Sequence, residues 1–331
     1  MVIKKTPPPR RLNNAVLPYA TMCSAAFSPD GTQLVTGNTT GNLYLWDVAS
    51  GELLSHGKTG GSDRMGIVYP SKTRFIAGSK TLHTFDAQSL KRIAKEPRYK
   101  GHKAPPNTLA LAPNGRTLVS GGGGFIHTHD RFVRLWDVAT GGPPRAKAKL
   151  ARQVGASGVC FDPKGRWVAT GGEDFRIRLH DPNDLTLLSD VEVAPRPEHG
   201  YPTLDSLVSD GNSLAVTDHN GRIFWLDTHD LTDVREIAPP TPQPGRPLEG
   251  ASATGLCFAG SKLIIPRTYA YKDGYGGFLQ VYDPKAGTII RQHEAELVHV
   301  SQALICPNNR WYLVLSTQGA LLWPIGDILG A

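Results

Sequence analysis

Short apolar runs alternate with turn residues along almost the whole chain. One run ends at Phe27 before the turn Ser-Pro-Asp-Gly at 28–31, and a later run ends in Trp46-Asp47 before a second turn. Residues 111–141 and 161–181 repeat this order. Apolar and polar residues alternating at a period of two, bounded by Pro, Asp and Gly, predict β-strands joined by tight turns. Each unit therefore predicts strand, turn, strand, loop and strand.

Weaker copies of the unit fill the gaps between these three. The residue that ends the third run of each unit, called the anchor below, recurs at intervals between 39 residues (46 to 85) and 56 residues (226 to 282). The anchors are Trp46, Phe85, Trp136, His180, Leu226, Tyr282 and Trp323. A repeat of this length indicates supersecondary units that bury their apolar faces against their neighbours.

The seven in-phase units, over residues 20–325, resemble the WD-repeat (WD40-type) family of β-propellers. The resemblance implies an all-β fold, a seven-bladed β-propeller of four-stranded antiparallel blades packed around a channel. The strict Ser-Pro-Asp-Gly and Val-Ala-Ser-Gly turns, with few cysteines, look like those of stand-alone bacterial-type members. We therefore expect a basic, Pro-rich N-terminal tail over 1–10 and a single propeller over 11–331.

The last unit has no fourth strand of its own, because only eight residues follow Trp323. Residues 11–18 precede the first strand of the first unit and have no other place in the pattern. The family resemblance implies that this N-terminal segment completes the last blade. Such closure would remove an exposed sheet edge.

Composition excludes several classes of protein. No apolar run reaches the length of a transmembrane helix, and no apolar stretch of a secretory signal follows the basic N-terminus. Four cysteines without a CxxC pair give no zinc signature, and their places in inner strands indicate buried free thiols. The formal net charge of +7 is a mild basic bias. We therefore expect a cytoplasmic protein that does not bind membranes.

Blades of this family often carry a hydrogen-bonded set of His, Ser or Thr, Asp and Trp. The positions that match it, with the Asp that follows the anchor, are His102, Ser120, Asp130, Trp136, Asp137, Trp46, Asp47, Thr170 and Asp174. The resemblance implies a structural role for them rather than a catalytic triad. The stretch between Ser120 and Asp130 is about six residues longer than its counterpart in the fourth unit, which leaves the Ser120 contact open.

Five insertions fall on the face that carries the loops between blades and between second and third strands. They cover 95–107, 121–131, 194–202, 238–253 and 266–277. They are rich in basic and aromatic residues, which are favoured at interfaces. The candidate partner-binding residues are Arg98, Tyr99, Lys100, His127, His129, Arg131, Arg196, His199, Tyr201, Arg267, Tyr269, Tyr271, Lys272 and Tyr275.

These features predict a non-enzymatic scaffold for protein–protein interaction, a monomeric propeller within a larger complex. The basic loops favour a protein or peptide partner with acidic or phosphorylated segments. No cofactor and no metal is expected. A metal at His127 and His129, and a phosphate at the glycines 121–124, are weaker alternatives. The rival function is a propeller enzyme, such as a lactonase, hydrolase or lyase, with a site at the channel mouth. Nucleic-acid binding by the basic face is less favoured.

Overall fold

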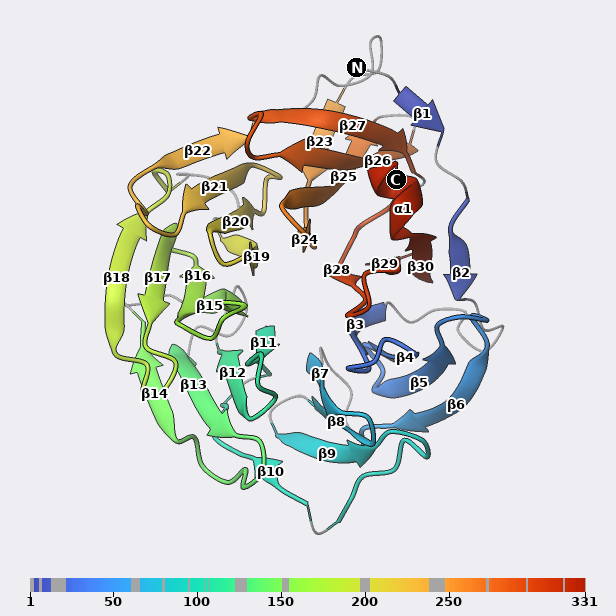
Figure 1. The fold of residues 1–331 in the computed structure, drawn as a ribbon. Helices are drawn as coiled ribbons and strands as arrows, with labels where there is room; N and C mark the ends of the chain where they lie inside the picture. The colour runs from blue at the N-terminus through green and yellow to red at the C-terminus, as the bar shows by residue number, and fades with distance from the viewer. Residues whose placement is uncertain are drawn as a thin grey trace.

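Nearly every described segment is a β-strand, and the strands lie in seven sheets arranged as a ring (Figure 1). The computed structural model describes residues 3–5, 8–12, 22–60, 66–78, 81–94, 96–103, 105–106, 108–122, 130–150, 155–196, 203–237, 248–271, 274–295, 297–317 and 319–330. The sheets are called blades one to seven in chain order of their inner strands. This is the predicted seven-bladed β-propeller of antiparallel blades.

The first four blades each have four strands. Blade one contains β3 (Met22–Phe27), β4 (Gln33–Asn38), β5 (Asn42–Asp47) and β6 (Leu53–Lys58). Blade two contains β7 (Gly66–Ser71), β8 (Arg74–Gly78), β9 (Leu82–Asp86) and β10 (Arg98–Tyr99). Blade three contains β11 (Thr108–Leu111), β12 (Thr117–Gly121), β13 (Phe132–Asp137) and β14 (Ala146–Lys149). Blade four contains β15 (Ala156–Phe161), β16 (Val168–Gly172), β17 (Arg176–His180) and β18 (Leu187–Glu192).

The last three blades complete the ring. Blade five contains β19 (Leu204–Ser209), β20 (Ser213–Asp218), β21 (Ile223–Asp227) and β22 (Val234–Ile237). Blade six contains β23 (Leu248–Ser252), β24 (Cys257–Ala259), β25 (Lys262–Tyr271), β26 (Gly274–Asp283), β27 (Thr288–Glu294) and β1 (Ile3–Lys5). Blade seven contains β28 (Gln302–Ile305), β29 (Trp311–Ser316), β30 (Gly319–Pro324) and β2 (Arg10–Leu12), and the helix α1 (Ile325–Leu329) follows β30.

All seven anchors lie on the third strand of a blade, as the repeat predicts. The six apolar anchors pack in seams between neighbouring blades: Trp46 of blade one, for example, shares a buried cluster with residues of blade seven. Fully burying one large apolar side chain contributes about 1.5–3 kcal/mol. The seams therefore hold the ring together in the way expected for repeats that bury little alone.

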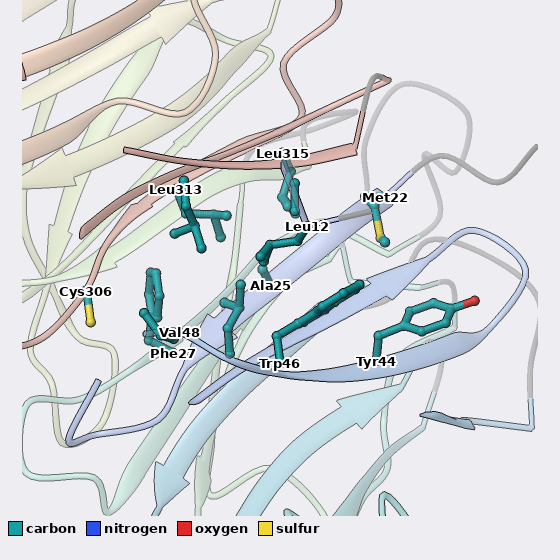
Figure 2. Close-up of a cluster of buried hydrophobic side chains, with 13 residues drawn as sticks. Leu12, Met22, Ala25, Phe27, Tyr44, Trp46, Val48, Cys306, Leu313 and Leu315 are labelled. Carbon is teal, nitrogen blue, oxygen red and sulfur yellow. The ribbon is translucent and has the colours of Figure 1, made fainter. Parts of the chain in front are cut away.

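The N-terminal segment closes the ring, as predicted. In β2, Arg10, Arg11 and Leu12 pair with Leu322, Leu321 and Ala320 of β30 in antiparallel register. The side chain of Leu12 is 1% exposed and packs between residues of blades one and seven (Figure 2). The pairing begins one residue earlier than the predicted segment 11–18, whose residues 13–18 lie outside the described residues. In addition, β1 pairs in parallel with β27 on the outer edge of blade six, so the segment expected to be a tail contains a paired strand.

Three of the predicted insertions contain a named strand in their described parts; in 238–253 it is β23, which pairs with β25. Residues 266–277 form most of a hairpin between β25 and β26, with pairs running from Leu263 and Tyr282 to Tyr271 and Gly274. The loop prediction there was wrong, because β25 is buried on both faces, with every residue from Leu263 to Tyr269 buried. Residues 95–107 include β10, the fourth strand of blade two, which pairs with β9.

The four cysteines are free thiols. Cys257 and Cys306 are buried, whereas Cys23 and Cys160 are half-buried, which is less than the inner-strand pattern predicts. Burial raises the pKa of Cys257 to about 12, so this thiol is protonated and unreactive at neutral pH. Among the described residues, no helix is long and apolar enough to cross a membrane.

Candidate functional site

The predicted partner-binding residues fall into three groups. Tyr99, Arg267 and Tyr269 are buried, so their placement on a docking surface was wrong. The side chains of a second group lie outside the described residues: His127, His129, His199, Tyr201, Tyr271 and Lys272. The rest reach the surface, with Arg131 half-buried and the others exposed: Arg98, Lys100, Arg131, Arg196 and Tyr275.

Arg98 and Lys100 lie at the outer edge of blade two, because Arg98 belongs to the outermost strand β10 and Lys100 follows it directly. Tyr275 lies on the β25–β26 hairpin, far along the ring. Among the described residues, Arg98, Lys100 and Arg131 therefore lie on blades two and three, whereas Tyr275 lies on the extended hairpin of blade six. Arg196 follows the outer strand of blade four.

The hairpin of blade six is longer than its counterparts. In blade one, the pairing of β4 with β5 runs from the anchor pair Leu34 and Trp46 only as far as Gly37 and Leu43. In blade six the equivalent ladder continues for five further pairs, from Arg267 and Phe278 to Tyr271 and Gly274. At about 3.3 Å per residue, this extends the hairpin by about 16 Å. The extension lies at the end of the blade that carries the loops between second and third strands.

Neighbouring segments hold this extension in place. On the channel side β23 pairs with residues 268–271 of β25, while the shorter β24 continues the inner strand below it. On the other side, Ala295 N donates a hydrogen bond to Gly277 O at 3.0 Å. A Cβ on Gly277 would lie 2.7 Å from Leu297 Cβ, so only glycine permits this approach.

Arg267 connects the base of the extension to blade five. Its guanidinium is 1% exposed, donates Nε to Gln280 Oε1 at 3.0 Å and donates Nη1 to Gly221 O at 2.9 Å. Gln280 in turn donates to Gln292 Oε1 at 2.6 Å. Burial lowers the pKa of Arg267. The side chain predicted to contact a partner therefore fixes the hairpin to its neighbour.

Tyr275 is the exposed aromatic residue of the extension. Its side chain is 51% exposed, and its ring meets that of His299 edge-on with centroids 5.1 Å apart. His299 follows the outer strand of blade six and has a left-handed backbone, with φ of 46°. Such backbone strain in a non-glycine residue is frequent at ligand-contacting positions. The two rings form an aromatic pair on the insertion-rich face.

A second, buried site lies in blade three and confirms the Ser120 contact. The His102 Nε2 atom is 2.6 Å from Ser120 Oγ, and its Nδ1 atom is 3.0 Å from Asp130 Oδ2. Arg134, which the sequence reading missed, places Nη2 2.7 Å from the other Asp130 oxygen. The Trp136 Nε1 atom has no hydrogen-bond partner within the described part of the chain. Instead, the Trp136 ring packs on that of His102, with centroids 5.3 Å apart.

The charges of this set follow from its burial. Burial opposes ionisation of Asp130, but the contacts with His102 and Arg134 outweigh it and lower its pKa to about 2. Burial also lowers the pKa of His102, so the ring is neutral at pH 7. A neutral ring donates Nδ1–H to Asp130 and accepts the Ser120 hydroxyl at Nε2. The spacing matches a Ser-His-Asp triad, but all three residues are buried. This burial agrees with the structural role that the family resemblance implies.

The glycines at 121–124 have a packing role at the two described positions. A Cβ on Gly121 would lie 2.6 Å from Ala156 O, and one on Gly122 would lie 2.8 Å from Asp130 Cγ. These glycines allow blade four and the Asp130 carboxylate to approach. The alternative of a phosphate cradle gains no support from either of them.

The other predicted structural residues make local contacts. Trp46 donates Nε1–H to Thr36 Oγ1 at 2.9 Å, as the family set implies. In blade four, Thr170 Oγ1 lies 3.2 Å from His180 Nε2, and Asp174 forms an ion pair with Arg178. Asp47 and Asp137 accept backbone N–H groups of the turns that follow their anchors. Within the ranges described, no group of three His, Cys, Asp or Glu side chains is placed to hold a metal ion.

The buried histidines predict a pH dependence of stability. Burial lowers the pKa of His102 and His180, so the unfolded chain binds more protons than the folded one below about pH 6.5. The melting temperature is therefore expected to fall between pH 7.5 and 5.5, a range that thermal scans cover. His219, whose pKa is raised by Asp205, and Glu173, whose pKa is raised by burial, oppose this trend. In His102→Gln the melting temperature is expected to fall less over the same pH range. A melting temperature of the wild-type chain that rises on acidification contradicts the prediction.

Comparison with known proteins agrees with the blades. The family model "WD domain, G-beta repeat" matches residues 18–47, 94–137 and 151–181, which cover parts of blades one to four. These three segments carry WD40 repeats. The matched segments include the units with the clearest sequence pattern, which end in the anchors Trp46, Trp136 and His180. The weaker units form blades in the structure without matching the model.

Three curated relatives of this chain have different descriptions. It is 33% identical over 160 residues to "Eukaryotic translation initiation factor 3 subunit I" of Nematostella vectensis, covering 44% of this chain and 47% of that protein. It is 27% identical over 174 residues to "U3 small nucleolar RNA-associated protein 15 homolog" of Gallus gallus, covering 51% and 31%. It is 26% identical over 169 residues to "APC/C activator protein CDC20" of Saccharomyces cerevisiae, covering 50% and 26%.

These matches span less than half the length of each relative. All three relatives are eukaryotic, so the bacterial character expected from the turn sequences is not supported. The similarity of turn residues arises from the repeat itself, because any WD40 blade needs tight turns between the same strands.

Proposed function

We propose that the protein is a non-enzymatic scaffold that holds a protein partner at the extended hairpin of blade six. The observation that carries this proposal is the exposed Tyr275 ring, seated against His299 on a hairpin that Arg267 fixes to blade five. Rigid aromatic residues with polar tips make large contacts at a low cost in conformational entropy. The relatives' descriptions as a subunit, a small nucleolar RNA-associated protein and an activator support work within an assembly.

The proposed partner carries acidic or phosphorylated residues, and the proposed compartment is the cytoplasm. Arg131 and Arg196, which reach the surface in blades three and four, favour negatively charged side chains on the partner. Four free thiols suit a reducing compartment. The buried Ser120 hydroxyl supports the proposal against a hydrolase that uses this set.

The paired variant Tyr275→Ser and His299→Ser tests the hairpin. Affinity capture from the native lysate is expected to lose its main partner, because truncating a central aromatic contact at an interface typically costs 2 kcal/mol or more, about thirtyfold in affinity. The matched control is Leu188→Ser, since Leu188 is 55% exposed but lies on the outer strand of blade four. An unchanged partner profile in the paired variant, or an equal loss in the control, overturns the proposal.

A further inference from the structure

The positive charge of the chain is concentrated in one segment. Residues 87–153 contain 13 Lys and Arg but only 3 Asp and Glu, a net charge of +10. The remaining chain has 23 basic and 26 acidic residues, a net charge of −3, so this segment accounts for the whole positive surplus. The segment runs from the outer part of blade two to the end of blade three.

Its basic side chains reach the surface at the outer edge of these two blades. Nine of those that the structure describes are exposed, Lys103 and Arg116 among them. The seven that lie between β9 and Lys100 or between β13 and Leu150 are called the basic rim: Lys91, Arg92, Arg98, Lys100, Arg145, Lys147 and Lys149. On β14 the two lysines alternate with Ala146 and Ala148, which pack against the core of blade three. The pleat therefore directs both lysines outward.

Backbone contacts join the two halves of the basic rim. Gly142 N donates a hydrogen bond to Arg98 O at 2.8 Å, and Lys100 N donates to Gly142 O at 3.2 Å. Tyr99 donates its hydroxyl to Val138 O at 2.7 Å. The outer strand of blade two thus lies beside the turn that leads into β14 (Figure 1). These contacts join the basic outer edges of the two blades.

The carboxylates of the segment do not neutralise this surface. Glu96 is paired with Arg74 at 2.8 Å, Asp130 is buried with His102 and Arg134, and Asp137 accepts backbone N–H groups of its turn. Burial, and then the proximity of Arg92, Arg98 and Lys100, lowers the pKa of His83. No ion pair to Lys91, Arg92, Arg98, Lys100 or Lys149 occurs among the residues that the structure places.

The chemistry of the rim distinguishes between polyanions. The exposed large apolar side chains of the described residues lie elsewhere, on β6, β18, β26 and β27, so the described part of the rim offers cations without the apolar anchor typical of a protein interface. A row of unpaired cations suits the phosphates of a nucleic acid, which are held without reading the bases. The rim is convex. A duplex, with a persistence length of about 150 base pairs, is too stiff to follow such a surface and contacts it over a short length only. A single strand is flexible enough to follow it.

We propose that the basic rim binds single-stranded RNA through its phosphate backbone. This surface is separate from the hairpin of blade six, so it goes beyond the proposed function. Arg98 and Lys100 of blade two and Lys149 of blade three are exposed and have no ion pair within the described part of the chain, so we expect them to contact the phosphates. Binding is expected to be independent of sequence and to weaken steeply with salt, because phosphate contacts release bound counterions.

Fluorescence anisotropy with a labelled RNA of about 16 nucleotides and mixed sequence tests this proposal. The variant Arg98→Gln, Lys100→Gln and Lys149→Gln is expected to bind about tenfold more weakly in low salt, and its slope of log K against log salt falls by about 2, near 0.7 per lost contact. The matched control is Lys164→Gln, Lys285→Gln and Arg310→Gln. It removes the same charge from exposed turns of blades four, six and seven and is expected to bind like the wild type.

Several results overturn the proposal. These are absence of RNA binding by the wild-type chain, equal weakening in the control, and tighter binding of a glutamate-rich peptide or of anionic vesicles than of the RNA. Circular dichroism and thermal scans confirm that both variants are folded. Because neither variant touches Tyr275 or His299, loss of RNA binding and loss of the protein partner are distinguishable.

Discussion

Deletion of residues 1–12 is expected to lower the melting temperature by about 10 °C or more. The deletion leaves the last blade with three strands, exposes the edge of β30 and removes Leu12 from the cluster between blades one and seven. Loss of a buried leucine side chain alone costs about 2–5 kcal/mol. For chains of about 150–250 residues, a loss of 1 kcal/mol in the free energy of unfolding lowers the melting temperature by about 2–4 °C.

Two further variants separate the contributions of the N-terminal strands. Deletion of residues 1–7 removes β1 but keeps β2, and it is expected to lower the melting temperature by less than the longer deletion. Leu12→Ala tests the buried side chain in a chain of full length. A melting temperature unchanged by removal of residues 1–12 shows that β2 does not hold the ring closed. Differential scanning calorimetry makes all three measurements.

The second large effect is expected from Asp130→Ala, which should cost about 3–5 kcal/mol of unfolding free energy. The substitution leaves the buried Arg134 guanidinium and the His102 ring without their shared acceptor. Chemical denaturation at pH 7 measures the loss. The pKa of Asp130, near 2, further predicts that its contribution is present above about pH 4 and is lost as the pH falls toward 2.

Asp174→Ala is the matched control, because Asp174 pairs with Arg178 at the same spacing in blade four. The Asp174 side chain is partly exposed, so water replaces the lost contact and the expected cost is about 1 kcal/mol or less. If both variants lose the same unfolding free energy, burial of the Asp130 contacts with His102 and Arg134 adds nothing to their stability.

The fold could be predicted from sequence because its signals are local. Each turn needs Pro, Asp or Gly within a few residues of an apolar run, so the seven anchors were placed on the correct strands. The strands of the extended hairpin of blade six were not predicted. Its glycines and alternating aromatic and basic residues resemble a loop, and its strand character depends on pairing with β23.

The site was harder to predict because burial depends on distant residues. Arg267 is buried by Gly221 and Gln280, which come from another blade and another strand. Arg134 was missed, although its spacing of four residues from Asp130 recurs in Asp174 and Arg178 and in Asp218 and Arg222. The continuity of the basic rim likewise depends on the contact of Arg98 with Gly142 between two blades.

The pairing of β2 with β30 also determines when the ring can form during synthesis. Arg10 faces Leu322, so the two partners leave the ribosome 312 residues apart. At a synthesis rate of about 5–20 residues per second, β2 stays unpaired for about 16–60 s before β30 has been synthesised. During that time the other blades can pack against one another in chain order, but the ring of blades cannot close. The short, arginine-rich strand is suited to this wait, since charge on an unpaired strand discourages association with other chains.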